Sequence, residues 1–181
     1  MDIYKLKFTR LQNEIFRLVC IKVGKPINQR GIAKLLKVSP TAISKALEGL
    51  KIEGLINIEK DLQMNLTLIE LNGEDKKVIG LKRVENLKMI YESRIANYLE
   101  DKFPGSIIIL FGSYSYGEDT IKSDIDIAII GCNEKKTNLE KFEKMLERDI
   151  RINFYESVEK IHKHLRSNIF NGIVLSGRIN L

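Results

Sequence analysis

The chain has 181 residues, a length that suits one generous domain or two compact ones. Its composition is 44% hydrophobic and 30% charged, with 12 Gly and 3 Pro, which excludes disordered, collagen-like and low-complexity classes. The formal net charge of +6 permits a polyanionic partner but does not require one. Cys20 and Cys132 lie far apart in apolar segments, so we expect neither a disulfide framework nor a cysteine metal site.

Apolar residues are dispersed along the chain. No segment approaches the roughly 18 uncharged apolar residues that a membrane span needs, and the N-terminus lacks the apolar core of a signal peptide. We therefore expect a cytoplasmic protein without a membrane partner, in a reducing compartment that suits its two cysteines.

The first part of the chain follows a pattern of three helices and a hairpin. Helical spacing of apolar residues predicts a first helix behind a cap at Thr9, and a short second helix behind Asn28. A third helix is expected after the break at Ser39-Pro40. Residues 55–60 and 65–71 then alternate apolar and polar side chains, as the two strands of a hairpin do.

This order of elements resembles the winged helix-turn-helix of transcription regulators, over roughly residues 8–72. In that family the third helix enters the major groove of double-stranded DNA, the hairpin touches the backbone, and homodimers read paired half-sites. Residues 22–51 hold seven basic side chains and the single acid Glu48. The net positive charge of this segment therefore equals the formal net charge of the whole chain. The resemblance implies DNA contacts by Lys37, Ser39, Thr41, Ser44, Lys45 and Lys51. The alternative is a solvated lysine face on a module that pairs protein chains.

Turn-forming and charged residues at 72–75 predict a domain boundary, which gives domains of 1–73 and 74–181. Helical spacing predicts one long helix over 76–102, ahead of a core at 104–181. This core is expected to hold strands and helices in alternation: strands at 106–111, 124–130 and 149–156, a charged helix at 138–148, and a closing helix at 157–170 before a short apolar tail. The fold class is therefore α+β, with a mixed sheet flanked by helices.

A pair of carboxylates carries the strongest chemical signal. Asp124 and Asp126 alternate with apolar Ile125 and Ile127, so in a strand both project from one face, about 7 Å apart at Cα. Two like charges placed this way repel, and a divalent cation between them converts repulsion into ligation. Magnesium (Mg²⁺) suits such a site, because it takes one or two carboxylates and completes its shell with water and phosphate oxygens.

The run Gly112-Ser113, ten residues, then Asp124-Ile125-Asp126 resembles the signature of the polymerase β-like nucleotidyltransferase superfamily in its minimal form, over roughly residues 84–175. The resemblance implies Mg²⁺-dependent transfer of a nucleoside monophosphate, here AMP from ATP, with Asp124 and Asp126 as catalytic metal ligands. Gly112, Ser113 and Ser123 would bind the nucleotide. Small members of this type occur as antitoxins that adenylylate a toxin partner, although most of those lack a winged helix.

One position departs from the family pattern. Members usually supply a third carboxylate from a later strand, where this chain has Asn153, whose neutral amide cannot act as a base. Asp149 or Glu156 could substitute if the register were shifted. The alternative function is therefore a transcription regulator whose catalytically reduced domain only senses nucleotide. His162 and His164, two apart on an expected helix, are predicted to point in different directions and not to share a metal.

Overall fold

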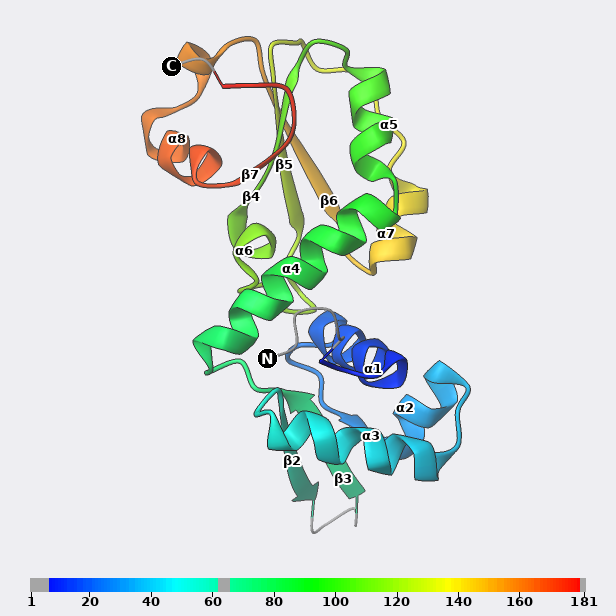
Figure 1. Cartoon of the computed structure of the whole chain (residues 1–181). Helices are drawn as coiled ribbons and strands as arrows, with labels where there is room; N and C mark the ends of the chain where they lie inside the picture. The colour runs from blue at the N-terminus through cyan, green and yellow to red at the C-terminus, as the bar shows by residue number, and fades with distance from the viewer. Residues whose placement is uncertain (1–6, 62–65, 180–181) are drawn as a thin grey trace. The chain divides into compact units, whose positions relative to one another are not determined.

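The computed structural model describes residues 7–61 and 66–179, and these form two compact units, Met1–Lys82 and Arg83–Leu181. Each unit has its own helices and strands (Figure 1). Each also has its own cluster of buried apolar side chains. No helix within the described ranges is long and apolar enough to cross a membrane.

The first unit is built on three helices, α1 (Arg10–Ile21), α2 (Gln29–Leu36) and α3 (Pro40–Ile52). The predicted caps of α1 and α2 are present, since Thr9 accepts a hydrogen bond from the Gln12 backbone amide in a capping box and Asn28 accepts from the Gly31 backbone amide. The start of α3 is capped by Ser39, which accepts from the Ala42 backbone amide. Each cap satisfies a backbone donor that the first helical turn would otherwise leave unpaired.

A three-stranded antiparallel sheet completes this unit. Strands β2 (Ile56–Asp61) and β3 (Leu66–Leu71) form the expected hairpin, whose tip at 62–65 lies outside the described residues. The two-residue strand β1 (Ile27–Asn28) pairs with β3 on its other side and was not predicted. Three helices with this hairpin are a winged helix-turn-helix, in which α2 and α3 are the helix-turn-helix and β2–β3 the wing.

The second unit is a mixed four-stranded sheet in the order β6-β5-β4-β7. The central strands β4 (Ile107–Phe111) and β5 (Ile125–Ile130) run antiparallel, and the edge strand β6 (Ile150–Tyr155) lies parallel to β5. The other edge strand, β7 (Ile173–Ser176), pairs antiparallel with β4. The short apolar tail, to which the sequence assigned no secondary structure, is therefore a strand, because pairing with β4 supplies its hydrogen bonds.

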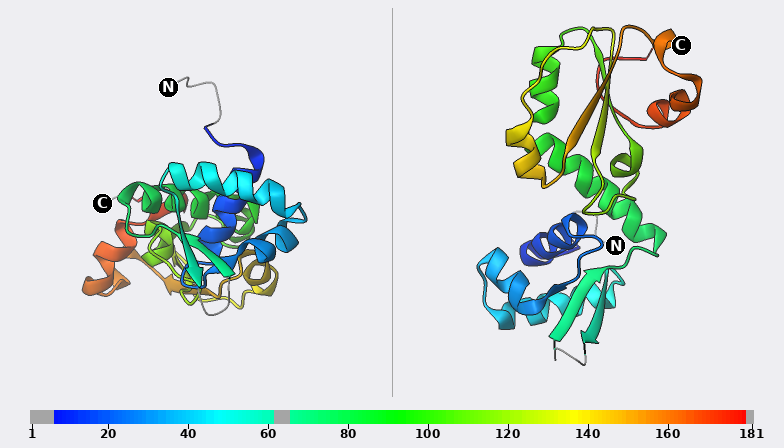
Figure 2. Two further views of the ribbon diagram at one scale, coloured as in Figure 1. Left: turned by 90° about the horizontal axis from the view of Figure 1, so that it is seen from below. Right: turned by 180° about the vertical axis from the view of Figure 1, so that it is seen from behind.

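Helices cover both faces of this sheet (Figures 1 and 2). On one face lies α8 (Lys163–Phe170), whose Ile169 packs with Ile109 and Ala128. On the other face lie α5 (Ile95–Lys102) and α7 (Glu140–Leu146), with Phe103 against Phe154 at 5.4 Å between ring centroids. The short helix α6 (Gly112–Tyr116) joins β4 to the loop that leads into β5, and the 3-10 turn η1 (Val158–Lys160) precedes α8.

The single helix predicted over 76–102 is wrong. The backbone forms α4 (Lys76–Glu92) and then α5, because Arg94 adopts a left-handed conformation with φ of 64°. The Ser93 hydroxyl supports this break by donating to the Ile90 carbonyl at 2.8 Å and accepting from the Ile95 amide at 3.4 Å. The helical spacing of apolar residues continues from α4 into α5, so the sequence pattern did not indicate the break between the two helices. The domain boundary near Gly73 stays a prediction, and the contacts divide the chain between Lys82 and Arg83, within α4.

Candidate active site

The two aspartates lie at the start of the central strand β5. Asp124 immediately precedes the strand and Asp126 is its second residue, while Ile125 and Ile127 between and beyond them are buried. The side chain of Asp124 is 23% exposed, and Asp126 is half-buried. The alternation predicted from sequence is therefore present, and both carboxylates sit on the face opposite the isoleucines.

Gly112 lies beside this pair because strand register brings it there. Phe111 at the end of β4 pairs with Asp126, and Gly112 follows with a positive φ of 71°. A Cβ on Gly112 would stand 2.6 Å from Oδ2 of Asp126. Glycine is thus required twice, for the backbone conformation and for the approach of the carboxylate. The two halves of the sequence motif meet in one place.

This contact can be tested with Gly112→Ala. We expect a loss of about 1–2 kcal/mol for the left-handed conformation and, in addition, displacement of the Asp126 carboxylate and loss of any activity that depends on it. Gly105→Ala is the matched control, since Gly105 has a φ of 80° with nothing within 4 Å of its Cβ position. Equal effects of the two variants on divalent-cation binding, measured by titration, would contradict the role of the contact.

The electrostatics of the pair are unfavourable without a cation. Burial raises the pKa of Asp126, the negative charge of Asp124 raises it further, and Arg151 lowers it in part. Arg151 donates to Oδ2 of Asp124 at 2.9 Å, so one arginine serves as counter-ion to two carboxylates. The carboxylate pair therefore has the character of a cation site.

Strand β6 decides which further side chains face the pair. Its parallel register places Arg151 beside Asp126 and Asn153 beside Ala128. Because side chains alternate along a strand, Asp149, Arg151 and Asn153 share one face, and Glu156 lies beyond the strand end. Asp149 directly precedes β6, and its carbonyl accepts from the Ile125 amide at 2.8 Å. The backbone of Asp149 therefore lies beside that of Ile125, next to Asp124, without a shift of register.

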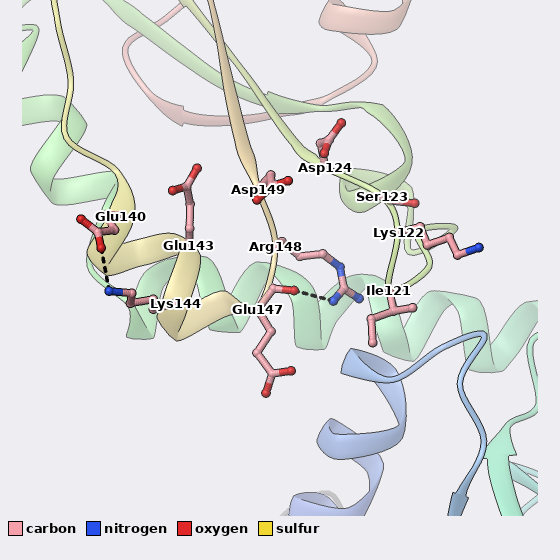
Figure 3. Close-up of a pocket in the computed structure, with 10 residues that line it drawn as sticks. All are labelled: Ile121, Lys122, Ser123, Asp124, Glu140, Glu143, Lys144, Glu147, Arg148 and Asp149. Atoms are coloured by element: carbon pink, nitrogen blue, oxygen red, sulfur yellow. Dashed lines mark hydrogen bonds and ion pairs between the residues drawn. The ribbon is translucent and has the colours of Figure 1, made fainter.

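An open pocket of about 440 Å³ lies against this end of the sheet (Figure 3). In Figure 3 Asp124 and Asp149 project from adjacent chain segments, whereas Glu147 points away from them. The lining is polar and of mixed charge: Ile121, Lys122, Ser123, Asp124, Glu140, Glu143, Lys144, Glu147, Arg148 and Asp149.

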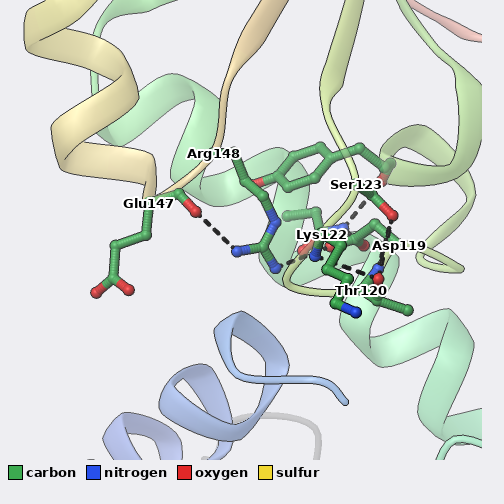
Figure 4. A network of polar contacts seen from close by, with 8 residues as sticks. Asp119, Thr120, Lys122, Ser123, Glu147 and Arg148 are labelled. Carbon is green, nitrogen blue, oxygen red and sulfur yellow. Dashed lines mark hydrogen bonds and ion pairs between the residues drawn. The ribbon is translucent and has the colours of Figure 1, made fainter. Parts of the chain in front are cut away.

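A buried polar network holds the loop that leads to Asp124 (Figure 4). Asp119, 1% exposed, accepts from the Asn86 amide at 2.7 Å and from the Arg148 guanidinium at 3.3 Å. Asn86 also donates to the Tyr114 carbonyl at 2.9 Å. Asp119 precedes Asp124 by five residues and Arg148 directly precedes Asp149, so the network fixes the approaches to both strands.

The serines assigned to nucleotide binding have different surroundings. Ser113 is the second residue of α6, next to Gly112, and is partly exposed. Ser123 forms part of a turn, in which its hydroxyl accepts from the Thr120 amide at 3.0 Å (Figure 4). Ser123 thus shapes the loop before Asp124, and its contact with nucleotide remains a prediction.

The residues assigned to DNA lie on and around α3. Ser39 caps the helix, Thr41 and Lys45 are exposed on it, and Ser44 is partly exposed between them. Lys37 ends α2 in a left-handed conformation with φ of 56°, and Lys51 is exposed in the last turn of α3. Glu48 is exposed on the same helix and would repel phosphate.

The two histidines are closer than expected. Their rings stack with centroids 5.7 Å apart and planes 18° from parallel, because α8 begins at Lys163 and His162 stands outside the helix as its cap residue. The prediction that they point in different directions is wrong. Neither belongs to a group of three potential metal ligands among the residues that the structure describes.

A sheet of this topology, with a glycine–serine turn against an aspartate pair, defines a minimal nucleotidyltransferase unit. Residues 92–176 match the nucleotidyltransferase domain family. A protein of Methanocaldococcus jannaschii, provisionally described as a protein adenylyltransferase, is 36% identical over 87 residues, which cover 46% of this chain and 87% of that protein. The chain belongs to the nucleotidyltransferase family.

Several solved structures of transcription regulators are similar to part of this chain. The adhesin competence repressor AdcR of Streptococcus pyogenes is 22% identical with a TM-score of 0.43, and covers 54% of this chain and 69% of its own. ZitR of Lactococcus lactis is 24% identical with a TM-score of 0.41, and the match covers 57% of this chain and 67% of ZitR. MepR of S. aureus, solved with DNA, is 20% identical with a TM-score of 0.40, and the match covers 52% of this chain and 77% of MepR. The winged-helix assignment here rests on the topology of the first unit itself.

The donor set at β5 fits one hard divalent cation. Asp124 and Asp126 offer carboxylate oxygens on one face, and the remaining positions suit water and phosphate oxygens. Within residues 7–61 and 66–179, no three acidic, histidine or cysteine side chains are grouped closely enough to hold a metal by themselves.

Proposed function

We propose that the chain is an Mg²⁺-dependent adenylyltransferase that moves AMP from ATP to a hydroxyl of a partner, and that its winged helix localises it on DNA. The observation that carries the proposal is the contact of Gly112 with Asp126, which joins the two parts of the family motif in one site. The adenylyltransferase description of the archaeal relative supports AMP as the transferred group.

In this proposal each group has a defined task. Asp124 and Asp126 hold the cation, which supplies Lewis-acid stabilisation of the leaving phosphate oxygens when it is bound. Gly112 lets the chain approach the phosphates, and the Ser113 hydroxyl donates to them. We assign to Asp149, which directly precedes β6 and lines the same pocket as Asp124, the task of accepting the proton of the attacking hydroxyl. The protein otherwise positions its reactants for in-line displacement.

The test measures nucleotide binding and label transfer separately. The full chain is incubated with ATP labelled in the α-phosphate, Mg²⁺ and candidate protein acceptors, with a parallel sample in excess chelator. We expect label on an acceptor, pyrophosphate release, and loss of both with chelator. Binding of ATP without transfer to any acceptor would overturn the enzymatic assignment.

A nucleotide sensor is the second candidate, and it is favoured by Asn153. The resemblance assigns the third carboxylate of the family to the position of Asn153, a neutral amide that the register of β6 puts beside Ala128. An Asn153→Asp variant separates the two functions, because a gain of transfer would identify the missing group. A sensor would instead bind nucleotide and change its DNA affinity without turnover.

We also propose that α3 reads duplex DNA, with Lys45 contacting phosphate. Lys45→Ala should weaken binding about equally for all sequences and lower the slope of log affinity against log salt by about one. Lys76→Ala, which removes an equal charge outside the helix-turn-helix, is the control. Polarisation assays that detect no affinity for duplex at low salt, or an affinity insensitive to salt, would contradict DNA binding. A protein acceptor, a toxin partner and a homodimer remain proposals of the same kind.

A further inference from the structure

Arg151 is the basic residue placed directly against the carboxylate pair. It lies on the edge strand β6, at the register position beside Asp126, and its guanidinium contacts Oδ2 of Asp124 at 2.9 Å. The arginine side chain is 71% exposed although its partner is only 23% exposed. Asp124 is therefore held within the sheet, whereas the Arg151 side chain is largely open to solvent. The arginine can leave the ion pair without disturbing the core.

The contact competes with the chemistry proposed for the site. Oδ2 of Asp124 cannot be a close ligand of a cation and also accept from the guanidinium at 2.9 Å without crowding two positive charges together. A cation that takes Oδ2 of Asp124 as a ligand therefore displaces the arginine. Its side chain is long, and its backbone remains fixed in the β5–β6 pairing, so it stays within the neighbourhood of the pair.

Charge balance indicates where the displaced guanidinium goes. A triphosphate carries more negative charge than one divalent cation neutralises, and it would approach two aspartates of the same sign. A further cation is needed on this face. Arginine presents a planar fork of donors that matches phosphate oxygens in a bidentate manner, which lysine cannot do.

We propose that Arg151 is a substrate-binding residue that pairs with Asp124 in the nucleotide-free protein and with the triphosphate once the cation and nucleotide bind. The inference rests on the proposed function, since it takes a nucleotide as the ligand. It gives β6 a binding role that the family motif at β4 and β5 does not contain.

The test uses two binding measurements on the full chain, neither of which requires turnover. The first is titration with Mn²⁺ alone, and the second is titration with a non-hydrolysable ATP analogue in the presence of Mg²⁺. The proteins compared are wild type, Arg151→Ala and Arg151→Lys. Lys135→Ala, which removes an equal charge from an exposed loop position, is the control. Thermal melting of each variant confirms that it is folded.

Arg151→Ala is expected to move the two affinities in opposite directions. Mn²⁺ should bind about three- to tenfold more tightly, because a competing cation is gone, and the analogue should bind about tenfold more weakly. Arg151→Lys should restore competition with Mn²⁺ but only part of the affinity for the analogue. Lys135→Ala should change neither appreciably.

Several results would overturn the inference. Unchanged or weaker Mn²⁺ binding by Arg151→Ala would show that the ion pair does not restrain the cation site. Unchanged analogue binding would show that the arginine does not reach the triphosphate, while leaving the proposed function intact. A wild-type protein that binds Mn²⁺ but no analogue would overturn the proposed function, and the triphosphate contact with it.

Discussion

Asp126→Asn should lower label transfer by about a thousandfold or more while leaving the protein folded. A metal ligand that stabilises charge in the transition state contributes several kcal/mol, and each 1.4 kcal/mol is about a factor of ten in rate. Asp124→Asn should behave similarly. Asp101→Asn, on the exposed side of α5, is the control for loss of one carboxylate. Wild-type rates in both site variants would show that the pair does not hold the catalytic cation.

Asp126→Asn, which should lower activity, should leave the stability of the metal-free protein unchanged or raise it. The folded state raises the pKa of Asp126, chiefly through burial and then through Asp124, so folding favours the protonated carboxyl. The stability that this group contributes is present at low pH and is lost as the pH rises through the raised pKa. Without metal at neutral pH, Asp126→Asn should therefore melt at the same temperature as wild type or higher. A clearly lower melting temperature would contradict this electrostatic account.

Asp119→Ala should destabilise the second unit by about 3–5 kcal/mol, because it leaves the buried Arg148 guanidinium without the carboxylate that it pairs with. The chain has no Trp, and of its six Tyr only Tyr4 lies outside the second unit. Urea unfolding followed by tyrosine fluorescence therefore reports on this unit without an introduced probe.

An exposed ion pair on α7 provides the control. Lys144 and Glu140 are 2.6 Å apart with side chains 74% and 70% exposed, so Glu140→Ala should cost less than about 1 kcal/mol. Burial, and not charge pairing as such, would then account for the difference. If the two variants were equally destabilised, the network of Asp119, Arg148 and Asn86 would not be a principal anchor of the loop.

The sequence predicted most of what depends on local chemistry. The caps at Thr9 and Asn28 were predicted because side-chain capping acts within three residues. The aspartate pair followed from strand alternation, and the family motif supplied Gly112.

Features that depend on pairing between distant segments escaped prediction. Strand β7 forms because it pairs with β4. Arg151 lies beside Asp126 because of the register in which β6 pairs with β5. The alternation of Asp149, Arg151 and Asn153 could have indicated a shared face, although nothing local fixes which of them meets the pair. Asp119 gave no signal at all, because an acidic residue in a loop is ordinarily solvated.

The sheet order divides the site into a constrained part and a substitutable part. Gly112 and Asp126 belong to the central strands and interlock, so a change at one requires a change at the other. Arg151 and Asn153 belong to an edge strand, and Asp149 directly precedes it, where outward-facing side chains can be exchanged at little cost in folding. Under the proposed function, single changes on β6 would be enough to strengthen, weaken or abolish turnover during evolution, while the contact between Gly112 and Asp126 is kept.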